Sequence, residues 1–182
     1  MTRLSLTLAL AALVTTLGLG CGGQDAPEDA GPATFENPDF GITFEYPSSF
    51  ETVDDLTFNR AAGSAAQATA GVALDESNLL GLQRFENPFA VTDENLDEVV
   101  PEADMLFSQL AGEPVKGIET EVAGLPAIEY DIPLQEPEEG ETRVTVFFDG
   151  ETQYLLNCQS TPEQREAVEA ACDMALETLE TT

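Results

Sequence analysis

Histidine and tryptophan are absent from this chain of 182 residues, and lysine occurs once, at Lys116. Without histidine the chain lacks the commonest general base and one member of the usual Ser-His-Asp triad. Zinc sites are disfavoured too, because they usually draw on histidine and cysteine, and only three cysteines are present. No G-x-S-x-G elbow surrounds Ser64, and no glycine-rich phosphate-binding loop occurs. These absences predict a protein that is not an enzyme and has no cofactor or metal site.

Positive charge is scarce as well, because six lysine and arginine residues face 35 aspartate and glutamate residues, for a net charge of −29. Such a surface repels the phosphates of nucleic acids, so we expect no nucleic-acid partner. It attracts cationic proteins and divalent cations, although a charge that serves only solubility is the simpler interpretation. The acidic loop Gln135 to Glu141 and the segment Val91 to Glu98 both lack the alternating Asp/Asn pattern of a calcium loop.

The N-terminus has the pattern of an export signal. Arg3 precedes an uncharged, mostly apolar stretch from Leu4 to Gly20 that ends in small residues. An uncleaved transmembrane helix is the alternative, but the run falls short of the usual ~18–20 residues and no basic stop-transfer cluster follows it. We therefore expect residues 1–20 to be a signal peptide.

Cys21 follows this stretch directly, and the residues LGLG before it resemble the lipobox of bacterial lipoproteins. In that family the cysteine is acylated and becomes the first residue after cleavage. The resemblance implies a palmitate-type lipid on Cys21 and a membrane anchor on the extracytoplasmic side of the cell membrane. Gly18 stands where many lipoboxes carry leucine, and a free cysteine in an ordinary signal peptide is the alternative.

Residues 21–34 are expected to form a flexible acidic tether. Gly, Asp, Ala and Pro dominate from Gly22 to Thr34 with no apolar periodicity. Such a segment reaches roughly 20 Å on average. Residues 35–182 have the length of one compact domain.

Alternating apolar residues predict several strands in this domain. They occur in GITFEYP around Phe44, in QATAGVAL around Val72, and in ETEVAGLPAIEYDIPL on both sides of a turn at Gly124. The clearest hairpin is TRVTVFF-DG-ETQYLLNC, in which Asp149 and Gly150 predict a type I′ turn.

Apolar residues at helical spacing predict two helices. The first runs from Thr92 to Ala111 and contains Pro101, which is expected to kink it. The second has Thr161 as its N-cap and Gln164 as the partner in a capping box. Its apolar stripe comprises Val168, Cys172, Ala175, Leu176 and Leu179. Together these elements predict an α+β fold, an antiparallel sheet flanked by helices.

Cys158 ends the last predicted strand, and Cys172 lies on the inward stripe of the last helix. An exported protein meets oxidising conditions, so a disulfide is the leading prediction. Closing a loop of ~15 residues stabilises a fold by about 3 kcal/mol in the chain-entropy model. Two buried free thiols and a metal pair are the alternatives.

Three segments in order resemble the PsbP-like superfamily: FENPDFGITFEYPSSFE, VAGLPAIEYDI and YLLNCQSTPEQREAVEAACDMALETL. The last of them resembles the closing strand, disulfide and helix of LpqN-type bacterial lipoproteins within that superfamily. The resemblance covers roughly Phe35 to Leu179 and implies an α-β-α sandwich with assembly, accessory or protein-binding roles. Many relatives carry a tryptophan after the Tyr-Pro element, where this chain has Phe50.

The leading hypothesis is therefore a membrane-anchored binding or accessory module of the cell envelope. It would hold an envelope protein or a small apolar ligand, and Phe85, Phe89 and Phe107 are candidates for a groove beside the mid-chain helix. Core packing is the alternative role for each of these rings. A carboxylate-based enzyme acting on envelope glycans and a passive acidic component that binds cations stay open as alternative functions.

Overall fold

The computed structural model describes residues 31–54, 56, 66–133 and 140–182. The predicted signal peptide and Cys21 lie outside the described residues, as do most of the predicted tether and of the loop Gln135 to Glu141. The described residues all belong to one compact unit, Gly31–Thr182. No helix among them is both long and apolar enough to cross a membrane.

A small antiparallel sheet consists of β1 (Ala33–Asn37), β2 (Ile42–Tyr46) and β9 (Glu180–Thr181), with β2 in the middle. Phe35 of β1 stacks on Phe44 of β2, with ring centroids 4.6 Å apart. Strand β1 begins at Ala33, inside the predicted tether, because Ala33 already pairs with Tyr46. The end of the chain thus pairs with one of its first strands.

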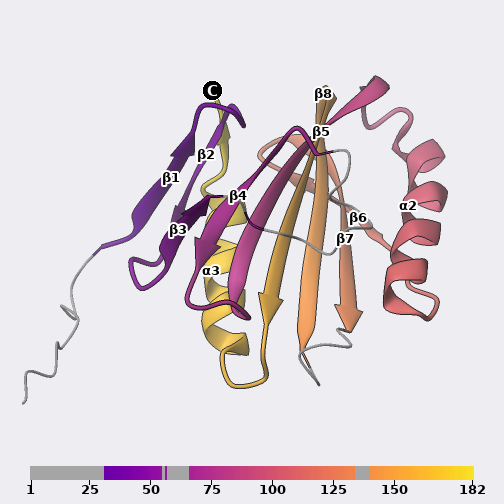
Figure 1. Ribbon diagram of the computed structural model, residues 1–182. Helices are drawn as coiled ribbons and strands as arrows, with labels where there is room; N and C mark the ends of the chain where they lie inside the picture. Colours follow the sequence, from indigo (N-terminus) through magenta and orange to yellow (C-terminus); the bar gives the residue numbers. More distant parts are fainter. Residues whose placement is uncertain (1–30, 55, 57–65, 134–139) are drawn as a thin grey trace, which may run out of the picture. The chain divides into compact units, whose positions relative to one another are not determined.

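The larger sheet has the order β3-β4-β5-β8-β7-β6, and its neighbouring strands pair antiparallel. Its strands are β3 (Glu51–Asp54), β4 (Ala68–Ala73), β5 (Leu79–Val91), β6 (Ile118–Val122), β7 (Leu125–Pro133) and β8 (Glu141–Ser160). The long β8 folds back on itself, since its residues 141–147 pair with β7 and 152–159 with β5. Phe147 in the first arm stacks on Tyr154 in the second, at 5.0 Å between ring centroids. The predicted hairpin is confirmed (Figure 1).

The turn type predicted for this hairpin is wrong. A type I′ turn needs positive φ at both central residues. Gly150 has φ 61°, but among the described residues other than glycine only Ala123 has a positive φ, so Asp149 does not. The turn is instead paired with a neighbouring strand, because Gly150 lies opposite Val91 of β5. The positive pair occurs in the other predicted hairpin, where Ala123 (53°) and Gly124 (79°) join β6 to β7.

Helix α2 (Leu96–Ala111) begins four residues later than predicted. Asn95 precedes it, and its side-chain Oδ1 accepts a hydrogen bond from the Thr92 amide at 2.7 Å. That bond holds Thr92 in a turn outside the helix. Pro101 lies inside the helix, as the sequence indicated.

Helix α3 (Arg165–Glu177) lacks the predicted capping box. Both the amide and the hydroxyl of Thr161 donate to Asn78 Oδ1, at 2.8 and 3.2 Å, so Thr161 is used outside the helix. Asn78 is buried and also donates to both carboxylate oxygens of Asp75. These side-chain bonds lower the pKa of Asp75. The end of β8 is therefore fastened to the loop before β5.

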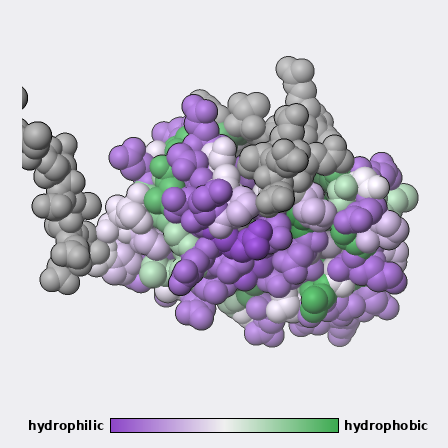
Figure 2. All heavy atoms as spheres, turned by 90° about the horizontal axis from the view of Figure 1, so that it is seen from below, coloured by the Kyte–Doolittle hydropathy of each residue, from purple (hydrophilic) through white to green (hydrophobic). Residues whose placement is uncertain are grey.

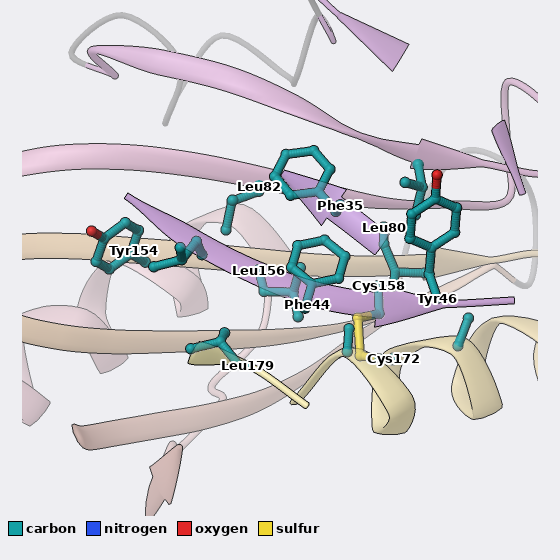
Figure 3. Close-up of a cluster of buried hydrophobic side chains, with 14 of the residues drawn as sticks. Phe35, Phe44, Tyr46, Leu80, Leu82, Tyr154, Leu156, Cys158, Cys172 and Leu179 are labelled. Carbon is teal, nitrogen blue, oxygen red and sulfur yellow. A yellow bond between two sulfur atoms is a disulfide. The ribbon is translucent and has the colours of Figure 1, made fainter. Parts of the chain in front are cut away.

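The larger sheet has an apolar core on each face. Ala127, Leu156 and Cys158 belong to the core that also contains residues of α3 and the small sheet. Ile128 and Tyr130, which alternate with Ala127 along β7, belong to the core that contains residues of α2. Figure 1 shows α2 and α3 on opposite sides of the sheet, and Figure 3 shows the core beside α3. The prediction of an antiparallel sheet flanked by helices is confirmed.

Candidate functional site

A disulfide joins the end of β8 to the middle of α3. Cys158 and Cys172 are bonded, with Cα atoms 6.0 Å apart, as the sequence predicted. Both residues are buried at 4% and 0% exposure, inside the core drawn in Figure 3. Because the sulfurs are bonded to each other, neither cysteine is a free thiol or a metal ligand.

Two ion pairs cross between the same strand and helix. Arg143 of β8 contacts Asp173 of α3 at 2.5 Å, and Arg165 of α3 contacts Glu141 of β8 at 3.1 Å. Each element thus contributes one arginine and one carboxylate. Both carboxylates are more than half exposed, so each pair stabilises the fold by no more than about 1 kcal/mol.

A groove of about 500 Å³ lies at this interface, between α3 and the strands β7 and β8. We call it the acidic groove, because its lining includes four carboxylates and one arginine: Glu129, Asp131, Glu141, Glu169 and Arg143. Cys158 also lines it, so the disulfide forms part of its wall. The alternation along β7 places Glu129 and Asp131 on the same face as Ala127, where α3 covers the sheet only in part.

The chemistry that this arrangement allows is the binding of positive charge. Asp131 and Glu169 are exposed and Glu129 is half-buried, so their negative charge is available to an approaching ligand, whereas Glu141 is paired with Arg165. Among residues 31–54, 56, 66–133 and 140–182, no three acidic or cysteine side chains are gathered in a metal-binding arrangement. The exposed carboxylates of the groove therefore suit a cationic ligand.

A hydrogen-bond network fastens the loop after α2 to the opposite face of the sheet. Asp104 of α2 accepts from the Tyr130 hydroxyl at 3.0 Å and from the Gly117 amide at 2.9 Å. Burial raises the pKa of Tyr130, and the bond to Asp104 raises it further. Ser108 both accepts from the Val115 amide and donates to its carbonyl oxygen. This network positions the start of β6.

The structure places the three phenylalanines proposed for a groove in different environments. Phe107 is buried in the core, with its ring centroid 4.4 Å from that of Tyr130. Phe85 is half-buried against the same core, and Phe89 is 51% exposed. None of them lines the acidic groove, which lies beside α3 and not beside the mid-chain helix.

Large apolar side chains are exposed at only a few positions in the part of the chain that the structure describes: Phe89, Met105, Leu106 and Ile118. Figure 2 shows a face on which hydrophilic side chains predominate and hydrophobic ones form small, separate patches. Lys116 is the single lysine and lies in the loop before β6. The surface is thus mainly charged, as the composition predicted.

The carboxylates of the acidic groove were not singled out by their sequence pattern. With 35 acidic residues in the chain, no one pair stands out. A usable signal exists in the alternation of AIEYDIP, which places Glu129 and Asp131 on one face and Ile128 and Tyr130 on the other. The alternation predicts a groove only when the position of α3 over the sheet is known, and the sequence of β7 does not contain that position.

Neither a protein-family model nor a curated protein matches the chain. Solved structures do, among them the solution structure of cyanobacterial PsbP (CyanoP) from Synechocystis sp. PCC 6803. The similarity has a TM-score of 0.56 at 14% identity and covers 89% of this chain and 97% of that one. A crystal structure from Bacteroides thetaiotaomicron VPI-5482 is similar with a TM-score of 0.53 at 11% identity, over 82% of this chain and 48% of that one. This chain thus spans about half of the Bacteroides protein's length. At these identities the similarity concerns the fold alone, and the chain has a PsbP-like fold.

Proposed function

We propose that this protein is a lipoprotein of the LpqN type, anchored through Cys21 on the extracytoplasmic side of a cell membrane. There it acts as a non-enzymatic binding or accessory module of the envelope. The observation that carries the proposal is the buried disulfide between Cys158 and Cys172. Such bonds persist in exported proteins and are rare in the cytosol, so the bond agrees with an export signal at residues 1–20. The lipobox-like residues before Cys21 then supply the anchor.

The binding role is supported by the form and charge of the acidic groove. Its carboxylates are accessible to water, an arrangement suited to reversible binding of cationic groups. General acid catalysis by a carboxyl group usually depends on an environment that shields it from solvent. Three of the four groove carboxylates are exposed, which favours binding over catalysis.

A carboxylate-based enzyme acting on envelope glycans is the second candidate, because four carboxylates line one groove. The double variant Glu129→Gln/Asp131→Asn separates the two. Under our proposal neither it nor the wild type releases reducing sugar from purified cell-wall glycan. Release by the wild type that is lost in the variant would establish the enzyme instead. A third candidate, a passive acidic component that binds cations, predicts calcium binding by calorimetry that the double variant does not change.

Lipid attachment is tested by metabolic labelling of the full chain in a bacterial host with an alkyne analogue of palmitate. We expect the label on the wild type, which sediments with membranes. The variant Cys21→Ser is expected to carry no label and to stay unattached.

The matched control is the double variant Cys158→Ser/Cys172→Ser, which removes the other two cysteines and keeps the lipobox. It should keep the label, because acylation at residue 21 does not depend on the disulfide. A wild-type protein with an uncut N-terminus and no label would contradict the anchor. Label retained by Cys21→Ser would place the lipid elsewhere.

A further inference from the structure

Strand β6 forms an open edge of the larger sheet. In the described part of the chain it pairs with β7 and with no other strand. Its first four residues are exposed, and Ile118 has 66% of its surface accessible. Ile118 pairs with Glu129 of β7, so the two side chains lie side by side on the face that carries the acidic groove. The edge and the groove are therefore one continuous surface.

The register identifies which backbone groups of β6 are free. In an antiparallel pair, opposite residues alternate between those that exchange both hydrogen bonds and those that exchange none. Glu121 lies opposite Pro126, which has no amide hydrogen, so this pair is of the second kind. By alternation Glu119 is of the same kind. The amide and carbonyl groups of Glu119 and Glu121 therefore point away from β7, to the outer side of the sheet.

The charge of this edge selects its occupant. Glu119 and Glu121 are exposed on β6, and Glu129 lies opposite Ile118 on β7, on the other face of the sheet. A second copy of β6 would place like charges opposite each other, which destabilises a strand pair. Acidic edge residues of this kind protect a sheet against self-association. The negative charge of Glu119 and Glu121 also attracts a strand that carries lysine or arginine.

We propose that an extended cationic segment of an envelope protein adds to β6 as a further strand, hydrogen-bonded to Glu119 and Glu121. This inference rests on the proposed binding role and names its surface and the chemistry of its partner. A strand added at β6 lies about 10 Å from β7, two strand spacings away. A long basic side chain on the groove face spans that distance by laying its methylene groups over Ile118, and its charged end then reaches Glu129. The partner thus alternates basic residues along a β-strand.

The test uses the purified mature protein in detergent and a synthetic peptide in which lysine alternates with valine. Binding is followed by calorimetry and by the amide NMR shifts of β6. We expect the peptide to bind and to shift the amides of Glu119 and Glu121 most. A peptide with glutamate in place of lysine, and a lysine peptide with alternate backbone amides methylated, should not bind measurably.

Variants separate charge from backbone pairing at one position. Glu119 alternates with Ile118 along β6, so its side chain lies on the face away from the groove. Glu119→Gln keeps the outward amide, so the dissociation constant should rise by no more than about threefold. Glu119→Pro also removes the outward amide and should raise it at least about tenfold, without disturbing the ladder to β7. Glu36→Gln, at an exposed position on the edge strand β1, should leave it unchanged.

Two results would overturn the inference: equal binding by the methylated peptide, or equal affinities for Glu119→Gln and Glu119→Pro. Either would reduce the interaction to charge alone. The methylated peptide keeps this conclusion independent of whether the proline variant folds. Because the measurement uses purified protein, failure of the lipid label leaves it intact, and failure here leaves the anchor intact.

Discussion

Gly117, the residue before β6, provides the sharpest test of the packing around α2. Its amide donates to Asp104 Oδ1 at 2.9 Å. A Cβ atom at this position would lie 2.3 Å from Cγ2 of Ile128 and 2.5 Å from Cζ of Tyr130. Both of those side chains are fully buried, at 0% and 1% exposure. The variant Gly117→Ala therefore cannot be accommodated by moving a flexible surface group.

The expected cost combines two effects. Overpacking a filled core destabilises by about 1–3 kcal/mol. Displacing Tyr130 or the 117 backbone weakens the hydrogen bonds to Asp104, which contribute about 1 kcal/mol each. We expect Gly117→Ala to lower the free energy of unfolding by about 3 kcal/mol, a large share of the 5–15 kcal/mol typical of a domain.

Urea denaturation followed by circular dichroism measures this change, and two other glycines serve as controls. A Cβ at Gly31 or Gly41 meets no atom within 4 Å, but Gly41 has φ +69°. Gly31→Ala should therefore be neutral, and Gly41→Ala should cost about 1 kcal/mol from the left-handed backbone alone. If Gly117→Ala costs no more than Gly41→Ala, the reasoning from steric contact is refuted.

Three further predictions concern other parts of the fold. Ala123→Asn should raise the free energy of unfolding by about 1 kcal/mol in the same assay, because asparagine tolerates the positive φ of the type I′ turn. An unchanged urea midpoint would contradict that turn geometry. Replacing Cys158 and Cys172 together by alanine should lower the free energy of unfolding by about 3 kcal/mol. The intact mass of the unfolded wild type after alkylation should show that neither cysteine is alkylated, whereas two alkylated cysteines would exclude the disulfide. The pKa of Tyr130 is raised in the folded state, so its contribution to stability is full below the ordinary value of 10.0 and falls as the pH rises above it. Tyr130→Phe should flatten this alkaline loss of the urea midpoint between pH 9 and pH 11, and an unchanged slope would mean that other groups cause it.

The sequence predicted much of the fold because alternation is a local property of each strand. Phe44, Val72 and the residues around Gly124 lie in strands where their spacing indicated. Errors occurred where a distant partner decides the outcome. Thr161 has the local pattern of an N-cap, yet Asn78, far away in the sequence, accepts its hydrogen bonds.

The site was predictable only in part, for the same reason. The pairing of Cys158 with Cys172 follows from their closeness in sequence and from the inward stripe of α3. The acidic groove depends on where α3 lies over β7, which no single segment contains. The aromatic side chains show the converse, since Phe107 looks like a ligand contact by type and is a core residue by position.

The pairing of β9 with β2 has a consequence for the order of events during synthesis. The hairpin of β1 and β2 can form early, but the second edge of β2 stays unpaired until Glu180 and Thr181 have been synthesised. The core next to that hairpin also requires α3, which precedes β9 directly. A polypeptide synthesised from its N-terminus therefore cannot complete the core beside α3 until α3 and β9 have been synthesised.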